Sequence, residues 1–136
     1  MALANGMIFI GADGFHIYNQ KMETMVNHQF QECIDACLSC AQACTHCATA
    51  CLREEQVAHL RKCIQLDIEC AAICRAAAEL MTLGSDFSAH LCRVCADVCN
   101  ACAAECEQHA AMDHCRICAE ACRLCAATCE SMATPV

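Results

Sequence analysis

Cysteine recurs at alternating spacings of three and four residues in three long stretches of this chain. The stretch at residues 33–51 reads CIDACLSCAQACTHCATAC, and its cysteines follow one another at steps of 4, 3, 4, 3 and 4. Residues 92–106 and 115–129 each show steps of 3, 4, 3 and 4. This spacing places the cysteines on one side of an α-helix, whereas a strand would need a period of two. The pattern therefore predicts helices whose inner faces are lined with thiols.

The cysteines divide among four consecutive segments. The expected helices cover residues 24–53, 55–83, 86–109 and 112–132. Gly84 is expected to end the second helix, and Ser85 or Asp86 to cap the third. Because the breaks near residues 54, 84 and 110 are short, successive helices should be antiparallel neighbours. The sequence thus predicts an all-α, antiparallel up-down-up-down four-helix bundle with a cysteine-lined core.

Residues 24–132 form this bundle in our interpretation. Residues 1–23 contain three glycines and fit no heptad, so we expect an N-terminal extension that is either disordered or packed outside the bundle. Residues 133–136 form a short tail. A length of 136 residues suits one compact domain of this kind.

Composition narrows the function further. The net charge of −8 disfavours nucleic acid and anionic membrane surfaces as partners. No run approaches the roughly 20 apolar residues of a membrane span. The 19 cysteines are odd in number and regularly spaced, unlike a disulfide framework. The opening residues MALANGMIFIGADG show neither a secretory nor a twin-arginine signal. We therefore expect reduced thiols in a cytoplasmic protein.

The heptad frame also predicts that the two ends of the bundle differ. One end should be an apolar plug made of Val26, Phe30, Ala77, Met81, Phe87 and Met132. The other end should collect Cys51, His109, Met112, His114 and Cys115, with Cys106 just inside. His28, His46 and His59 do not occupy inward positions of the heptad frame, and we expect their side chains to be solvated.

Asp67 is the unusual member of the frame on the second helix, which otherwise contains Leu60, Cys63, Cys70, Cys74, Ala77 and Met81. A carboxylate among buried thiols is unfavourable unless it is paired or bound to metal. Asp67 is therefore expected to be either a metal ligand or a partner of the thiols.

A thiol lining indicates a soft metal. Zinc sites usually need four ligands presented by loops, and the compact cysteine run of iron–sulfur proteins is absent. Cu(I) accepts two or three thiolates, and helix neighbours at i+3 or i+4 lie about 5–6 Å apart at Cβ. With about one Cu(I) per bridging thiolate the core is nearly neutral, whereas divalent ions at that ratio would leave a large buried charge.

The expected metal ligands are all of the cysteines together with four other residues. They are Cys33, Cys37, Cys40, Cys44, Cys47, Cys51, Cys63, Cys70, Cys74, Cys92, Cys95, Cys99, Cys102, Cys106, Cys115, Cys118, Cys122, Cys125, Cys129, Asp67, His109, Met112 and His114.

The stretches CIDACLSCAQACTHCATAC, CRVCADVCNACAAEC and CRICAEACRLCAATC resemble those of the bacterial copper storage proteins over residues 24–132. The resemblance implies a four-helix bundle that holds many Cu(I) ions, with His and Met residues where copper enters. Without a twin-arginine signal the chain is similar to the cytosolic branch, which is typically homotetrameric.

We therefore expect a non-enzymatic cytosolic store of Cu(I) that serves detoxification and supplies copper chaperones or apo forms of copper enzymes. Two alternatives remain open at this stage within metal binding and electron transfer: a zinc or general soft-metal buffer, and a ferredoxin-like iron–sulfur protein. An enzymatic alternative is a thiol oxidoreductase that uses Cys92 and Cys95 near a helix start, where a thiol pKa is lowered.

Overall fold

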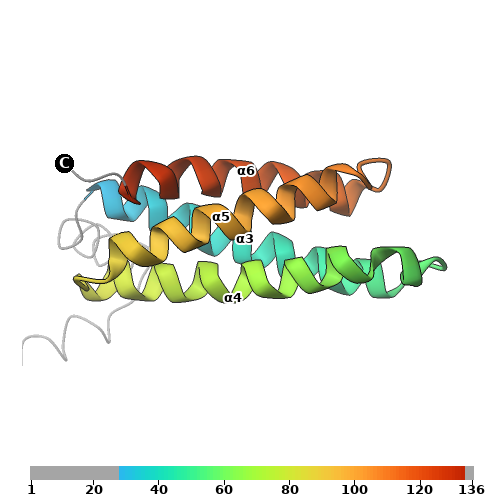
Figure 1. Ribbon diagram of the computed structural model, residues 1–136, viewed down its shortest axis with the longest axis horizontal. Coiled ribbons are helices and arrows are strands. Elements are labelled where there is room, and N and C mark those ends of the chain that lie inside the picture. The colour runs from blue at the N-terminus through green and yellow to red at the C-terminus, as the bar shows by residue number, and fades with distance from the viewer. Residues whose placement is uncertain (1–27, 134–136) are drawn as a thin grey trace, which may run out of the picture.

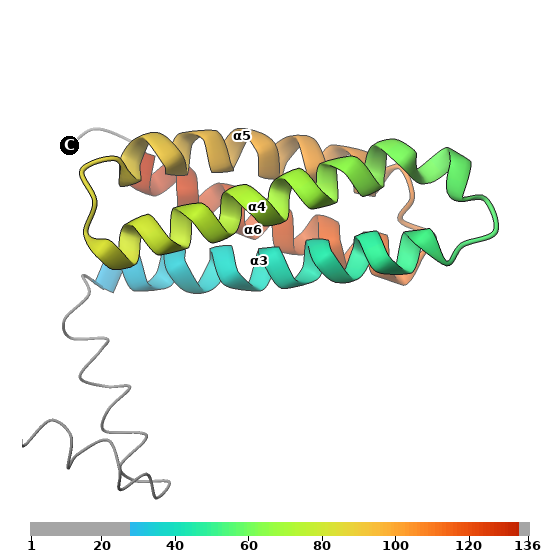
Figure 2. The ribbon, with the colours of Figure 1, turned by 90° about the horizontal axis from the view of Figure 1, so that it is seen from below.

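The computed structural model describes residues 28–133 of the chain. Four long helices lie side by side along its long axis (Figure 1, Figure 2). They are α3 (His28–Leu52), α4 (Arg61–Leu83), α5 (Ser88–Glu107) and α6 (Asp113–Ala133), and the short 3-10 helix η1 (Val57–Leu60) precedes α4. Successive helices run in opposite directions, and residues 28–133 contain no strand. The predicted all-α, up-down-up-down bundle is confirmed.

The turn between α4 and α5 follows from one glycine and one serine. Gly84 adopts the left-handed conformation, with φ of 67°, and its N–H reaches the carbonyls of Leu80 and Met81. The N–H of Ser85 also donates to Leu80, at 3.0 Å, which completes a Schellman-type end to the helix. Gly84 thus ends α4 as predicted.

The predicted cap of α5 by Ser85 or Asp86 is wrong. Helix α5 begins at Ser88, and Phe87 occupies the cap position without a side-chain hydrogen bond. Ser85 instead stabilises the turn before the helix: its hydroxyl accepts the N–H of Phe87 at 3.1 Å, and its carbonyl accepts the hydroxyl of Ser88 at 2.8 Å. Ser85 therefore stabilises the turn that precedes α5 and does not cap the helix itself.

The core is made of the cysteines. All 19 have free thiols and none is more than 1% exposed. The heptad frame predicted for α4 also points inward, because Leu60, Asp67, Ala77 and Met81 are all buried. Each helix therefore turns its predicted cysteine face to the centre of the bundle.

Small residues line one flank of each cysteine face. Two buried alanines seven residues apart stand on every long helix: Ala41 and Ala48, Ala71 and Ala78, Ala96 and Ala103, Ala119 and Ala126. Polar bridges run along the same side of the helices: Arg75 donates to Thr45 from α4 to α3, and Arg123 pairs with Glu107 from α6 to α5. The more extensive helix contacts are those of α3 with α4 and of α5 with α6. Alanine thus lets the helices of each pair pack closely.

The two ends of the bundle differ. The α3–α4 and α5–α6 connections lie together at one end, and the α4–α5 turn lies at the other (Figure 2). At the end with the α4–α5 turn, Ala77 and Met81 are buried, while Phe30 and Met132 are partly buried and pack against the core. The predicted apolar plug is present in these four residues.

Phe87 is not part of that plug, because it is 67% exposed. The inward position of the frame, four residues before Cys92, is occupied by Ser88, which is buried. Val26 and residues 1–23 and 134–136 lie outside the described part of the chain. Among the helices described, none combines the length and the apolar character required to cross a bilayer.

Candidate metal centre

The buried thiols touch one another across all four helices. Between α3 and α6 the Sγ atoms of Cys40 and Cys122 lie 3.7 Å apart, and those of Cys44 and Cys118 also 3.7 Å. Between α4 and α5 the pairs Cys74–Cys95, Cys70–Cys99 and Cys63–Cys106 are each separated by 3.6 Å. Contacts of Cys40 with Cys70, at 3.8 Å, and of Cys74 with Cys125, at 3.8 Å, connect these two rows. Asp67, which contacts Cys63 and Cys118, and a group formed by Cys63 with Cys47, Cys51 and Cys115 within 4.8 Å extend these rows to the other end of the bundle, so the buried ligand atoms form one network along the interior.

Within this network several groups of four thiols are compact enough to hold a metal ion, with ligand atoms within 4.8 Å of one another. They include Cys37, Cys95, Cys125 and Cys129; Cys40, Cys70, Cys74 and Cys99; Cys40, Cys44, Cys70 and Cys122; and Cys44, Cys102, Cys118 and Cys122. Because Cys40, Cys44 and Cys122 each belong to more than one group, neighbouring sites share ligands. Such sharing is what bridging thiolates require.

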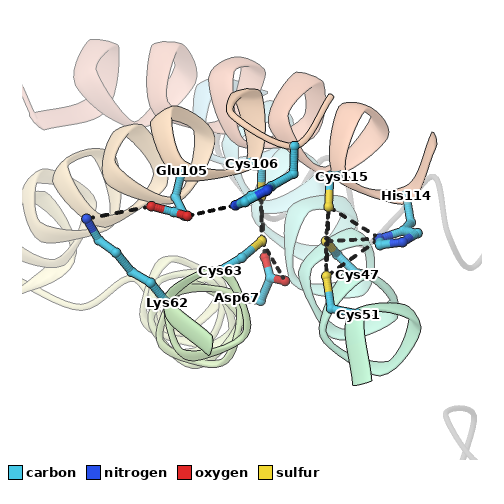
Figure 3. A network of polar contacts seen from close by, with 10 residues as sticks. Cys47, Cys51, Lys62, Cys63, Asp67, Glu105, Cys106, His114 and Cys115 are labelled. Carbon is cyan, nitrogen blue, oxygen red and sulfur yellow. Dashed lines mark hydrogen bonds and ion pairs between the residues drawn. The ribbon is translucent and has the colours of Figure 1, made fainter. Parts of the chain in front are cut away.

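Asp67 lies near the N-terminal end of α4, where it is fully buried and in contact with thiols. Its Oδ1 accepts from Cys102 at 3.2 Å and from Cys118 at 3.3 Å. Its Oδ2 faces Cys63 at 3.9 Å (Figure 3). Burial, and after it negative charge on Cys118 and Cys63, raises the pKa of the Asp67 carboxyl to about 8. The structure thus gives Asp67 thiol partners from three helices.

One end of the network is bordered by His114, at the start of α6. Its Nδ1 lies 3.4 Å from Sγ of Cys115 and 3.7 Å from Sγ of both Cys47 and Cys51 (Figure 3). Its Nε2 contacts Oε1 of Glu54 at 3.1 Å. Sequence reasoning placed His114, Cys51 and Cys115 at this end together, and the structure brings them into contact. We call Cys47, Cys51, Cys115 and His114 the mouth cluster.

His109 lies at the same end but faces a different partner. Its Nε2 contacts Oε2 of Glu105 at 2.9 Å, and the other oxygen of this buried carboxylate faces Lys62 at 3.6 Å. Residues of the α3–α4 connection together with His59, His109 and Met112 line an open depression of about 510 Å³. Thus His109 and Met112 border the outside of the mouth, and the imidazole of His109 is hydrogen-bonded to Glu105.

Three features of this end were missed by sequence reasoning. Glu105 precedes His109 by four residues on one helix, so that pair was visible as an i,i+4 contact. Glu54 lies in a connection 60 residues from His114, and no periodicity marks it. His59 is exposed, as expected from the frame, but it lines the same depression as His109.

His46 is exposed on α3, also as expected from the frame. The side chain of His28 lies outside the described part of the chain.

The thiols at the mouth hold their protons at neutral pH. Burial raises the pKa of Cys115 to about 11, and burial likewise raises the pKa of Cys51 above its ordinary range. Metal binding needs the thiolate, so each ion that binds must displace protons from these groups. Uptake of metal is therefore coupled to proton release.

A four-helix bundle whose interior is a continuous network of free, buried thiols belongs to the class of proteins that hold several soft metal ions at once. The comparisons with known proteins agree. The sequence matches the copper storage protein family over residues 26–134, and the chain belongs to that family.

Solved structures and a curated relative show the same likeness. The Cu(I)-bound copper storage protein BsCsp3 is 48% identical, with a TM-score of 0.75 over 78% of this chain and 99% of its own. A cytosolic copper storage protein from Streptomyces lividans, solved with five coppers, is 46% identical, with a TM-score of 0.77 over 80% of this chain and 95% of its own. The uncharacterized cysteine-rich protein YhjQ of Bacillus subtilis is 50% identical over 82 residues, which cover 60% of this chain and 76% of that protein.

Proposed function

We propose that this protein is a non-enzymatic, cytosolic store that binds many Cu(I) ions through the thiolates of its core. The observation that carries the proposal is the network of buried thiols across the four helices, which Asp67 joins to the thiols at the mouth. A site for catalysis needs a few positioned groups, whereas this network repeats one ligand along the whole bundle. The cytosolic assignment is supported by the relative from Streptomyces lividans.

The thiolates would hold the metal by sharing it. A thiol loses its proton when Cu(I) binds, and each thiolate then bridges two ions, so the buried charges nearly cancel. Because neighbouring Sγ atoms lie 3.6–4.0 Å apart, an ion can exchange one ligand for the next without leaving the bundle. Asp67, with thiols on both oxygens, is proposed as a ligand or partner on this path, just inside the mouth cluster.

Cu(I) would enter at the mouth cluster. His114 contacts three thiols there, and His109 and Met112 line the depression outside it. These three residues supply imidazole nitrogen and thioether sulfur, both suitable for copper. We propose that they pass the ion inward from copper donors and outward to copper chaperones or apo-enzymes.

A homotetramer completes the proposal. Support comes from apolar side chains on α4, on α5 and in the turn between them that the bundle leaves in solvent: Leu83 is 72% exposed, Phe87 67% and Val94 47%. Neighbouring copies of the chain would cover such side chains. Measurement of the mass in solution tests this part separately from metal binding.

Anaerobic titration of the reduced protein with Cu(I), against a competing chelator of known affinity, tests storage. We expect saturation only after many equivalents per chain, and a reduced capacity for Cys122→Ser, which removes a thiol shared between two groups. Saturation at one or two equivalents would contradict storage. Tight uptake of zinc at about one ion per four thiols would instead support a general metal buffer.

The enzymatic alternative has its own test. Cys92 and Cys95 are both fully buried, which does not suit the exposed, reactive thiol of an oxidoreductase. If any thiol–disulfide exchange activity of the protein were lost in the variant Cys92→Ser/Cys95→Ser while Cu(I) capacity stayed high, the oxidoreductase would be favoured. We expect no such loss.

A further inference from the structure

The mouth cluster differs in its geometry from a general collection of thiols. Its four ligand atoms are Sγ of Cys47, Cys51 and Cys115 and Nδ1 of His114, and every one of the six separations between them is short. The three sulfur–sulfur distances are 3.9, 3.8 and 3.8 Å. The three nitrogen–sulfur distances are 3.7, 3.7 and 3.4 Å. Four points with six such similar separations form a nearly regular tetrahedron.

These edges match those of a tetrahedral zinc site. With Zn–S of about 2.3 Å and Zn–N of about 2.0–2.1 Å, tetrahedral ligands lie about 3.8 Å apart for two sulfurs and about 3.5 Å apart for nitrogen and sulfur. The mouth cluster departs from these values by about 0.2 Å or less, within the tolerance of such sites. Three cysteines and one histidine are also among the ligand sets that structural zinc sites use.

A second layer of the site fits the same interpretation. Oε1 of Glu54 lies 3.1 Å from Nε2 of His114, so Nε2–H donates to the carboxylate and Nδ1 presents its lone pair to the three sulfurs. A carboxylate behind a ligating histidine fixes the tautomer and the ring orientation, and it makes the imidazole a better ligand. Glu54 is 41% exposed and His114 13% exposed in their side chains, so the cluster lies at the boundary with water.

Charge separates this cluster from the thiol groups deeper in the bundle. A divalent ion with four thiolates carries a net charge of −2, and the deep groups are wholly buried. The same ion with three thiolates and a neutral imidazole carries −1. Because burial of uncompensated charge is costly, the first divalent ion should bind at the mouth.

We propose that the mouth cluster is a Zn²⁺ site, in which Cys47, Cys51, Cys115 and His114 bind one ion per chain. Binding transfers the three thiol protons to solvent and involves no change of oxidation state. The site uses the same four side chains that we propose for Cu(I) entry, but binding of Zn²⁺ there does not require that the protein store copper. In the absence of copper the ion would cross-link α3 to α6 at the mouth cluster. Cu(I) would displace it, because thiolates bind Cu(I) in preference to Zn²⁺.

The test uses the reduced, metal-free, full-length protein under anaerobic conditions. Zn²⁺ is titrated against a chelator of known affinity, and Co²⁺ is titrated separately, because its absorption bands report tetrahedral geometry and thiolate ligation. We expect one Zn²⁺ to bind more tightly than all others, with release of about three protons. The first Co²⁺ should show a tetrahedral spectrum.

Three variants identify the ligands. His114→Ala should weaken the first Zn²⁺ at least about tenfold, and Glu54→Gln should weaken it about 10–100-fold while leaving a tetrahedral Co²⁺ spectrum. The matched control is Cys63→Ser. Cys63 belongs to an all-thiol group with the same three cysteines, but its nearer contacts are Cys106 and Asp67, so its loss should leave the first ion unchanged. Circular dichroism of each variant verifies the fold.

The reverse pattern would overturn the proposal. If Cys63→Ser weakens the first ion and His114→Ala does not, the ion occupies a site of four thiolates. Uptake of several equivalent Zn²⁺ ions, or of none against a weak chelator, also contradicts a single mouth site. The Cu(I) capacity of the wild-type chain is measured separately, so failure of this proposal would leave copper storage unaffected.

Discussion

At the scale of single residues, Asp67 is the group whose environment differs most from that of the same residue in water. It is fully buried with thiols on both carboxyl oxygens, and its pKa is raised to about 8 by burial first and by negative charge on Cys118 and Cys63 second. A protonated carboxyl is neutral, which makes its burial among thiols tolerable. The metal-free protein therefore retains a proton on Asp67 that the unfolded chain gives up near pH 4.

This difference makes the stability of the metal-free protein depend on pH. Between about pH 4 and pH 8 Asp67 holds a proton in the folded chain but not in the unfolded chain. Its contribution to stability is therefore fully present below pH 4 and falls as pH rises toward 8, by up to about 1.4 kcal/mol per pH unit. Asp67→Asn should remove this slope, and Asp97→Asn, at an exposed position, should keep it. Urea unfolding of the reduced protein at pH 5 and pH 7 measures both. Equal slopes in wild type and Asp67→Asn would contradict this account.

Residue identities at the mouth could be predicted from the sequence only in part. The heptad frame brought Cys51, Cys115 and His114 to one end because each lies at or beside a frame position. The frame could not show that His109 turns to Glu105, since that choice depends on a side-chain rotation. Nor could it find Glu54, whose contact with His114 joins the α3–α4 connection to the start of α6.

At the scale of the helices, the flanking alanines determine how closely the pairs pack. The alanine pairs seven residues apart on α3, α4, α5 and α6 are buried, and bridges such as Arg75 to Thr45 run along the same side. A larger side chain there would push the helices apart and disturb the Sγ contacts of the core. Alanine favours helix in any sequence, but only the structure shows which alanines lie between helices.

Ala103→Leu tests this close packing. Ala103 is wholly buried on α5, so the three extra heavy atoms of leucine cannot fit without displacement, and we expect a loss of about 1–3 kcal/mol in the free energy of unfolding. The control is the adjacent, exposed Ala104: Ala104→Leu should change stability by no more than about 0.5 kcal/mol. Urea unfolding of the reduced, metal-free proteins gives both values. Similar values for the two variants would show that this flank is not tightly packed.

Gly84 tests the end of α4. Its φ of 67° is in the left-handed region, and a Cβ built there meets no atom within 4 Å. The cost of Gly84→Ala should therefore come from the backbone alone, about 1–2 kcal/mol, and Gly84→Asn should cost less because asparagine tolerates this region. Thermal unfolding ranks the three proteins. An alanine variant as stable as wild type would mean that the turn relaxes without cost.

At the scale of the whole molecule, the bundle has an interior lined with thiols along its length and two ends that differ in their residues. The number, order and direction of the helices could be predicted because cysteine spacing and short connections each allow one simple solution. The position of Phe87 could not, since a shift of one residue at the start of α5 exchanged it for Ser88. Helix starts depend on local turn geometry, whereas the frame depends on the whole helix.

The free energy of unfolding of the bundle should increase as Cu(I) binds. A site such as that of Cys37, Cys95, Cys125 and Cys129 takes ligands from α3, α5 and α6, so a bound Cu(I) ion cross-links helices that thiols alone hold only weakly. At a free concentration of about 1,000 times the dissociation constant, each site adds about 4.1 kcal/mol. We expect the unfolding temperature, measured anaerobically by calorimetry, to rise with each equivalent of Cu(I). The rise should be smaller for Cys125→Ser and smaller at low pH, where protons compete for the thiols. An unfolding temperature that does not change with loading would place the copper outside the core.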